Sequence, residues 1–258
     1  MILEEFDNNK IAVFNPSDIQ QRKEGFPKIV VGFYLKDLME EFVKVYNPEK
    51  IFTIKSYTTN FDIYKITTSN GVDIAVMQAP LGAPYSVSIF EEVAVLGAEY
   101  FFLAGSCGCL DNSVGEYSII IPTSAIRDEG TSYHYAPASD EIELEKEVVD
   151  SIEKTLNELN IPFCKGKTWT TDALYRETPE KVQKRKEMGA IAVDMECSAM
   201  TAFAKFKGFK FGELFYGADD LSSDKYDVRS LIQGELSKQA KIIPILIKCA
   251  EDYYLSLK

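Results

Sequence analysis

Histidine and tryptophan are almost absent from this sequence. Of its 258 residues, only His134 and Trp169 are of these types. A zinc site built from cysteine and histidine needs several such ligands at close spacing, and a Ser-His-Asp triad would have to use the one histidine. The chain also lacks a G-x-S-x-G nucleophile elbow. We therefore expect neither a metal centre nor a serine-hydrolase triad, and no cofactor is indicated.

The chain also lacks an even cysteine set, a positive net charge and a long apolar run. Its five cysteines are an odd number, and their spacing does not match that of a disulfide framework. This is typical of a protein from a reducing compartment. Its net charge of −12 argues against nucleic acid as a partner. Runs such as "IIPILI" are too short to span a membrane, and the acidic start is unlike a signal peptide. We expect a cytoplasmic protein with small-molecule partners.

Hydrophobic periodicity predicts alternating strands and helices. In the first half we expect a strand over 10–14, a helix over 30–46, a hairpin around Asn70–Gly71, a helix within 86–100 and a strand over 100–105. In the second half we expect strands over 117–126, 191–195 and 209–220, helices over 143–160 and 196–208, and helix from Asp227 onwards, broken near Pro244.

This alternation predicts the fold class. Strands that alternate with helices are typical of a sheet covered on both faces. We expect one α/β domain over residues 1–258, with a central mixed, twisted sheet flanked by helices. Ligands of such sheets bind at the carboxyl ends of strands. Three strand ends here carry unusual chemistry: "LAGSCG", "AVDMEC" and "YGADDL".

In "AVDMEC", two carboxylates follow a buried strand. If the backbone is extended, Asp194 and Glu196 point to the same side while Met195 points to the other. Ionised carboxylates on one side repel each other, so each needs hydrogen-bond donors, and the vicinal hydroxyls of a ribose can supply them. A helix cap or a salt bridge is the structural alternative. We favour a functional Glu196 and a structural Asp194.

The other two strand ends are less specific. In "LAGSCG", Gly105 and Gly108 can turn the backbone sharply and Ser106 can donate to an anion, but a simple turn without a ligand explains them as well. In "YGADDL", Asp219 can act as a general acid if burial raises its pKa. A solvated acidic loop is the alternative for Asp219 and Asp220.

Two polar loops complete the candidate residues. In "TWTTDALYRET", an aromatic ring and a guanidinium, Tyr175 and Arg176, can stack on a heterocycle, although they can equally anchor the loop. In "AIRDEGTSYHYAP", Arg127, Asp128 and His134 are favoured as a buried polar network that fixes the loop.

Six segments follow one another along the chain: "APLGAPYSVS", "AGSCG", "IPTSAIRDEGTSYHYAP", "TWTTDALYRET", "VDMEC" and "GADDL". Taken together, they resemble the nucleoside phosphorylase superfamily. That superfamily includes uridine phosphorylase, hexameric bacterial purine nucleoside phosphorylase and methylthioadenosine nucleosidase. The matches occur in order and cover more than half of the chain, with Asp194 in place of the first Glu of the family's Val-Glu-Met-Glu motif.

The resemblance implies an enzyme that cleaves a purine nucleoside or uridine with phosphate, giving the free base and ribose 1-phosphate. It implies a homo-oligomer, dimer or hexamer. For the site it implies that Glu196 accepts hydrogen bonds from the ribose hydroxyls, that Met195 packs on the sugar or base, and that Asp219 protonates the leaving base. The remaining implied contacts are Gly105 and Ser106 on the phosphate side, and Leu174, Tyr175 and Arg176 beside the base.

The chain departs from the family at the phosphate site. A Gly-Asp-Pro-x-Arg segment is absent near the N-terminus, and Leu103 stands where the family has an arginine before the glycine-serine turn. Arginine is hard to replace where an oxyanion is held by two hydrogen bonds. Lys23, Lys28, Arg127 or a neighbouring subunit can compensate. The alternatives are a nucleosidase that uses water and a nucleoside-binding protein without turnover.

Overall fold

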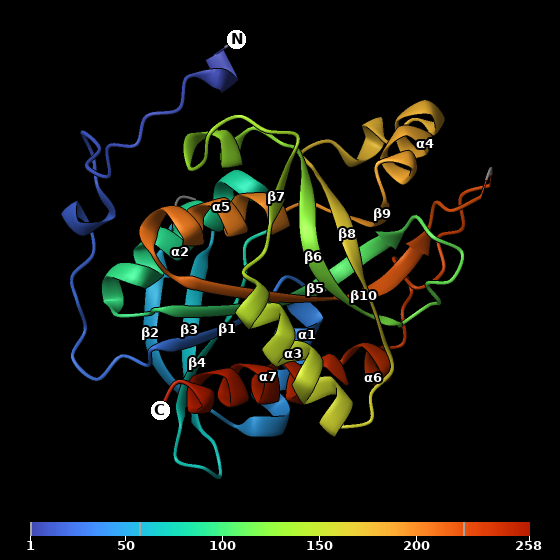
Figure 1. The fold of residues 1–258 in the computed structure, drawn as a ribbon. Coiled ribbons are helices and arrows are strands. Elements are labelled where there is room, and N and C mark those ends of the chain that lie inside the picture. Colours follow the sequence, from blue (N-terminus) through green and yellow to red (C-terminus); the bar gives the residue numbers. More distant parts are fainter. Residues whose placement is uncertain (1, 57, 224) are drawn as a thin grey trace.

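A ten-stranded mixed sheet forms the centre of the molecule, as the computed structural model shows for residues 2–56, 58–223 and 225–258 (Figure 1). Helices cover both of its faces. The expected α/β fold class is confirmed. The strands are β1 Ile29–Phe33, β2 Glu49–Lys55, β3 Asn60–Thr67, β4 Asp73–Gln78, β5 Tyr100–Cys109, β6 Ile119–Asp128, β7 Glu141–Glu143, β8 Phe163–Thr171, β9 Ala190–Asp194 and β10 Lys210–Asp220.

Half of the sheet closes on itself. The strands follow the order β10-β6-β8-β9-β5-β1-β4-β3-β2, and β10 also pairs with β5. Strands β5, β10, β6, β8 and β9 therefore form a closed ring, and β1, β4, β3 and β2 extend from it as an open sheet. Strand β5 pairs in parallel with β1 and β10 but antiparallel with β9. This closure brings the ends of β9 and β10 to either side of β5.

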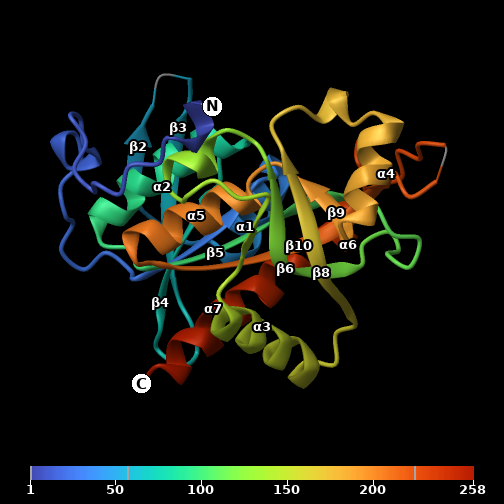
Figure 2. The ribbon, with the colours of Figure 1, turned by 45° about the horizontal axis from the view of Figure 1, so that its top comes forward.

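Two helix pairs cover the sheet (Figures 1 and 2). Helices α3 and α7 pack on each other over one face, and α2 packs on α5 over the other. The short helix η3 packs on α5, and α4 lies beside β9. The bounds of the helices are α1 Lys36–Tyr46, α2 Ala83–Leu96, α3 Lys146–Glu158, α4 Pro179–Glu187, α5 Cys197–Lys207, α6 Leu236–Gln239, α7 Ile242–Ser256, η1 Ile2–Glu4, η2 Pro16–Asp18, η3 Thr131–His134 and η4 Leu174–Arg176.

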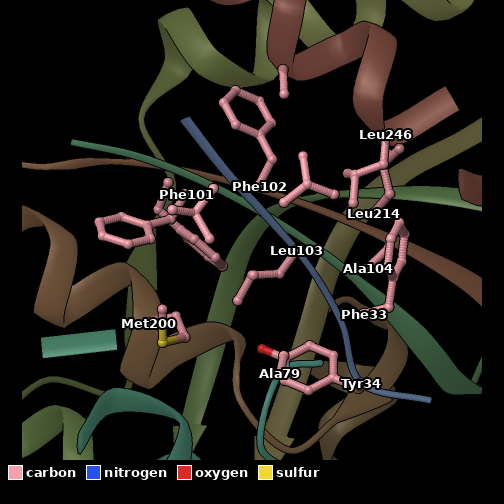
Figure 3. Close-up of a cluster of buried hydrophobic side chains, with 14 of the residues drawn as sticks. Phe33, Tyr34, Ala79, Phe101, Phe102, Leu103, Ala104, Met200, Leu214 and Leu246 are labelled. Carbon is pink, nitrogen blue, oxygen red and sulfur yellow. The ribbon is translucent and has the colours of Figure 1, made fainter. Parts of the chain in front are cut away.

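Strand β5 supplies side chains to the core on both faces of the sheet. Phe101 packs edge-on against Phe90 of α2, while Phe102 reaches Tyr253 of α7 (Figure 3). Successive residues of a strand point to opposite faces, so both positions must be apolar where both faces are covered. Burying each such ring contributes on the order of 2 kcal/mol.

Two N-terminal expectations are wrong. Residues 10–14 form no strand, and Val13 and Phe14 are exposed. The amides of Ile11 and Ala12 donate to the side chains of Asn9 and Asn15 instead of to a neighbouring strand. Residues 30–46 do not form one helix, since strand β1 precedes α1. All five residues of β1 are buried and hydrogen-bonded between β4 and β5. Pairing on both sides therefore outweighs the helix-like spacing of the apolar residues.

The C-terminal segment also differs from the expectation. Helix does not begin at Asp227; it starts at α6 and resumes at α7. Pro244 lies in the first turn of α7, where proline is tolerated because the first amides of a helix have no intrahelical acceptor. The interruption therefore precedes Pro244.

The hairpin at Asn70–Gly71 is confirmed, with β3 and β4 antiparallel and Gly71 at φ 75°. The strands and helices expected between residues 86 and 220 are also present. Strand β5, however, continues beyond the expected end at Gly105 to Cys109. Within the described residues, no helix combines the length and the apolar character needed to cross a membrane.

Candidate active site

The junction of β9 and α5 is built around Asp194. Its Oδ1 accepts hydrogen bonds from the Thr168 and Thr170 hydroxyls, both at 2.9 Å. Its Oδ2 accepts from the backbone amides of Glu196 at 2.7 Å and Cys197 at 2.6 Å. Burial raises the pKa of Asp194 to about 6, against the lowering effect of these four donors. Asp194 therefore caps the start of α5 and has the structural role that the sequence favours.

Glu196 lies two residues further on and has fewer partners. It is the residue before α5 begins, and it is buried. Its Oε1 accepts a hydrogen bond of 2.6 Å from the Gly82 amide, at the start of α2. Burial and the charge of Asp194 raise the pKa of Glu196 to about 8. A carboxylate offers about four acceptor positions, so this side chain has capacity for further donors. Met195, between the two acids, is half-buried.

A buried network ties this junction to the loop after β6. The Thr170 hydroxyl accepts a hydrogen bond from the Ser198 amide at 3.0 Å, and the Ser198 hydroxyl donates to Glu129 Oε1 at 2.8 Å. Glu129 Oε2 in turn accepts from the Ser132 amide at 2.9 Å. The start of α5 is thereby held against two strand ends, β6 and β8, which fixes the position of the backbone that carries Glu196.

The polar loop after β6 is structural. The Arg127 guanidinium donates to the Ser132 and Ser139 hydroxyls and to two backbone carbonyls of residues 136–137. Asp128 accepts from the Trp169 indole at 3.0 Å and pairs with Arg185. The favoured interpretation of Arg127 and Asp128 as a polar network that fixes the loop is thus confirmed, and Arg127 is not free to bind an anion. For His134 the prediction of a buried position is wrong, because this residue is exposed on η3.

Asp219 lies at the same edge of the sheet as Glu196. It pairs with Gly108 of β5, which pairs on its other side with Val193 of β9. Asp219 is buried, and burial raises its pKa. Glu177, which the sequence did not single out, lies nearby: burial and the charge of Asp219 raise the pKa of Glu177 to about 7. This edge therefore carries two carboxyls with raised pKa values.

The neighbouring Asp220 is already paired. Its carboxylate forms an ion pair with Arg229 and accepts a hydrogen bond of 2.8 Å from the Ser222 amide. The Arg229 guanidinium also donates to the Val114 carbonyl at 3.3 Å. This pair fixes the loop after β10. Asp219 has no such ion pair among the described residues, and its side chain is hydrogen-bonded with Tyr226.

The loop after β8 lies near the junction of β9 and α5. Asp172 accepts a hydrogen bond of 2.9 Å from the Gly130 amide, and its charge adds to the raised pKa of Glu196. Leu174, Tyr175 and Arg176 follow in η4. The exposed fraction is 43% for Leu174 and 93% for Tyr175. Within this chain these residues lie on the surface of the loop and do not pack into the site.

Gly105 and Ser106 do not form the turn that the sequence predicts, since both lie inside β5. A Cβ atom on Gly105 would come 2.8 Å from Cδ2 of Tyr34, so the glycine makes room for this ring. Ser106 pairs in register with Tyr216 and, by alternation, faces the other side of the strand. The Ser106 side chain therefore does not point into the space beside Gly105.

Two of the three cations that could replace the missing arginines are held elsewhere by their own partners. Arg127 is held by its own loop, and Lys28 forms an ion pair of 3.0 Å with Glu99. Lys23 is exposed, and its amide donates to the Leu96 carbonyl. Metal ligands are also not grouped among the described residues. No three or more side chains of histidine, cysteine, aspartate or glutamate there are arranged so that they could hold a metal ion.

The fold and the site define a class: a mixed α/β protein with buried carboxyls at the ends of its strands. The chain belongs to the Phosphorylase superfamily, whose family model matches residues 29–242.

Three relatives carry names of nucleoside phosphorylases. A guanosine phosphorylase of Halorubrum lacusprofundi is 28% identical over 58% of this chain and 64% of its own length. A uridine phosphorylase of Thermococcus kodakarensis is 30% identical over 47% and 42%. A DeoD-type purine nucleoside phosphorylase of Bacillus cytotoxicus is 28% identical over 53% and 59%. Each alignment therefore spans less than two thirds of the relative.

A solved structure shares the fold over a larger part of the chain. The AMP nucleosidase from Bacteroides thetaiotaomicron superposes with a TM-score of 0.68 and covers 88% of each chain at 17% sequence identity. At this identity the likeness concerns the fold alone.

Proposed function

We propose that this protein cleaves the N-glycosidic bond of a nucleoside and releases the free base. The observation that carries the proposal is Glu196: a buried carboxyl at a strand–helix junction, held by one amide, with acceptor positions left for a ligand. The vicinal hydroxyls of a ribose supply such donors and favour the ionised form. The family match and the names of the relatives support a nucleoside as the ligand.

Asp219 completes the chemistry that we propose. When the bond from C1′ to the base breaks, negative charge develops on the base while the sugar becomes a cation. A proton or hydrogen bond from Asp219 to the base stabilises the leaving group, and burial prepares Asp219 for this role by raising its pKa. A purine can accept the proton at N7, so this arrangement supports purine nucleosides over uridine.

Two acceptors for the ribosyl group follow from different observations. Phosphate is the acceptor that the names of the relatives imply, with ribose 1-phosphate as the product. Gly105 and Ser106 would then lie on its side, Met195 against the sugar, and Leu174, Tyr175 and Arg176 near the base. Water is the second candidate, because Leu103 stands where the family has an arginine before the glycine-serine turn. A homo-oligomer, dimer or hexamer, is part of the same proposal.

Replacing Glu196 tests the proposal. We expect Glu196→Ala to lower kcat/KM for base release from purine nucleosides by about a hundredfold, because hydrogen bonds to a charged group are lost. Base release is measured by absorbance with guanosine, inosine, adenosine and uridine, each with and without phosphate. Glu180→Ala, an exposed glutamate of α4, is the control. An unchanged kcat/KM in Glu196→Ala would remove this residue from the site.

A further inference from the structure

A cavity of about 590 Å³ lies where α6 and the start of α7 meet the first residues of β6 and β8. Sites for small organic molecules have volumes in this range and are lined mainly by apolar side chains. The residues that we propose to hold the nucleoside are not among those that line this cavity. The cavity is therefore a second candidate site. Its apolar wall is formed by Ile119, Ile161, Phe163, Ile242 and Ile245.

Gln239 is a buried polar residue that lines the same cavity. Its exposed fraction is 8%, and its side-chain amide forms no hydrogen bond with any described residue. Only its backbone is paired, because its N–H donates to the Glu235 carbonyl at 3.1 Å. A side-chain amide can donate two hydrogen bonds and accept two, and buried polar groups are nearly always satisfied by protein or by water. The unused capacity of Gln239 therefore points to a polar partner inside the cavity.

Two lysines line the cavity, and only one of them is neutralised. Lys238 forms an ion pair of 2.6 Å with Glu235, and its ammonium lies 5.3 Å from the centre of the Tyr117 ring. Glu116, an exposed acid of the same cavity, lies on this side, since its charge contributes to the raised pKa of Lys238. Lys241 forms no ion pair with a described residue. The cavity therefore keeps one uncompensated positive charge.

The start of α7 adds to this positive charge. Lys241 is the residue directly before this helix of 15 residues, and Ile242 and Ile245 of its first turn line the cavity. The aligned peptide dipoles of a helix place a positive partial charge at its N-terminus. An anionic group between Lys241 and the first turn of α7 would interact favourably with both.

We propose that this cavity binds a small organic anion with an apolar body, in which a carboxylate or a phosphate monoester is attached to an aromatic or aliphatic group. The apolar body packs on the isoleucines and Phe163, where its removal from water stabilises the complex. The anionic group lies at Lys241 and the start of α7, and the Gln239 amide donates a hydrogen bond to it. This inference does not depend on the proposed cleavage of a nucleoside.

The reactivity of Cys164 provides a local measurement of binding. This thiol lines the cavity and is partly exposed, whereas Cys107, Cys109, Cys197 and Cys249 are buried. Burial raises the pKa of Cys164, so labelling with N-ethylmaleimide is carried out at mildly alkaline pH. Mass spectrometry of the digested protein follows the label at each cysteine. A ligand in the cavity should slow the labelling of Cys164 several-fold.

Four probes separate the parts of the ligand. The anions are 4-phenylbutyrate and phenyl phosphate, the neutral counterpart is 4-phenylbutan-1-ol, and inorganic phosphate is an anionic group without an apolar body. We expect both organic anions to protect Cys164 and to bind in calorimetric titrations, and the tighter of the two identifies the preferred anionic group. Equal affinity for the neutral alcohol or for inorganic phosphate would overturn the inference, as would the absence of protection by both anions.

Two variants test the residues that hold the anionic group. Lys241→Ala removes the charge, and Gln239→Leu removes the amide at similar size. We expect each to weaken binding of the organic anions about tenfold, because a hydrogen bond to a charged group is lost. Lys184→Ala, on the exposed surface of α4, is the matched control and should leave the Kd unchanged. If Lys241→Ala, which lies at the surface, folds and binds as the unmodified protein does, the inference is wrong.

Discussion

Asp194 and Glu196 are separated by one residue, yet their surroundings give them different roles. Asp194 has four donors around two oxygens, and its pKa rises only to about 6 in spite of complete burial. Glu196 has the Gly82 amide as its main donor, and its pKa rises to about 8. A buried carboxyl that is short of donors costs stability unless it is protonated or meets a ligand. The difference in hydrogen bonding, not in burial, thus singles out Glu196.

This difference predicts how stability depends on pH. Glu196 holds its proton up to about pH 8 in the folded protein but only to its ordinary value of 4.5 in the unfolded chain. Between these values the folded state binds more protons, so the free energy of unfolding falls as pH rises. We expect a fall of a few kcal/mol, at about 1.4 kcal/mol per pKa unit. Urea unfolding at a series of pH values between 5 and 8 measures it.

The comparison with Glu196→Gln isolates the effect. Glutamine keeps the shape but does not titrate, so the variant should lose the part of the slope that Glu196 contributes. It should keep the part due to the other carboxyls with raised pKa values, Asp194, Glu177, Asp219 and Glu213. Glu180→Gln, on the exposed surface of α4, should keep the slope of the unmodified protein. Equal slopes in the unmodified protein and in Glu196→Gln would show that Glu196 does not carry the proton.

At the scale of elements, strand β5 decides the form of the site. Its segment 105–109 reads as a turn in the sequence, but β10 pairs with it up to Cys109 and β9 pairs with its end. The glycines are needed because neighbouring side chains approach the backbone: Tyr34 at Gly105, and Leu221 and Val193 at Gly108. Close packing, not a sharp turn, explains these two glycines.

The contact between β5 and the end of β1 can be measured with a double-mutant cycle. Gly105→Ala places a methyl group 2.8 Å from the Tyr34 ring, and we expect it to lower the free energy of unfolding by about 1–3 kcal/mol. In a Tyr34→Ala background the space is open, so the same substitution should cost much less. Chemical denaturation of the four proteins gives the coupling energy. Additive effects would mean that the ring does not pack on Gly105.

At the scale of the molecule, the closed half of the sheet contains the candidate site, and the N-terminal segment lies outside it. Residues 2–25 include no buried residue. They contact the rest of the chain at a few points, such as Phe6 against Phe206 and Gln20 against Glu92. The family match begins after this segment, at residue 29. The core therefore does not depend on it.

Removing this segment tests that conclusion. We expect a variant that lacks residues 1–24 to unfold cooperatively, with a Tm lower by at most about 5 °C, since few apolar contacts are lost. Circular dichroism during heating measures both properties. Loss of the cooperative transition would show that the segment is part of the folding unit.

Sequence patterns correctly predicted the structural features that interactions between neighbouring residues determine. The Asn70–Gly71 turn, the helix that ends at Gly208, and the strand–helix junction at Asp194 each depend on neighbours in the sequence, and each is present. The prediction of one helix over residues 30–46 was wrong because β1 is a strand only through pairing with β4 and β5. The prediction of a strand over residues 10–14 was wrong because side chains of Asn9 and Asn15 accept hydrogen bonds from two of its amides.

The sequence by itself determined the α/β class and the junction that carries Glu196, because these follow from hydrophobic period, turn residues and the order of motifs. Only the tertiary structure decided that Tyr34 fills the space beside Gly105, that Ser106 faces away from it, and that Asp219 and Glu213 are buried. Those facts depend on which strands become neighbours in the closed sheet, and strand pairing joins segments that lie far apart along the chain.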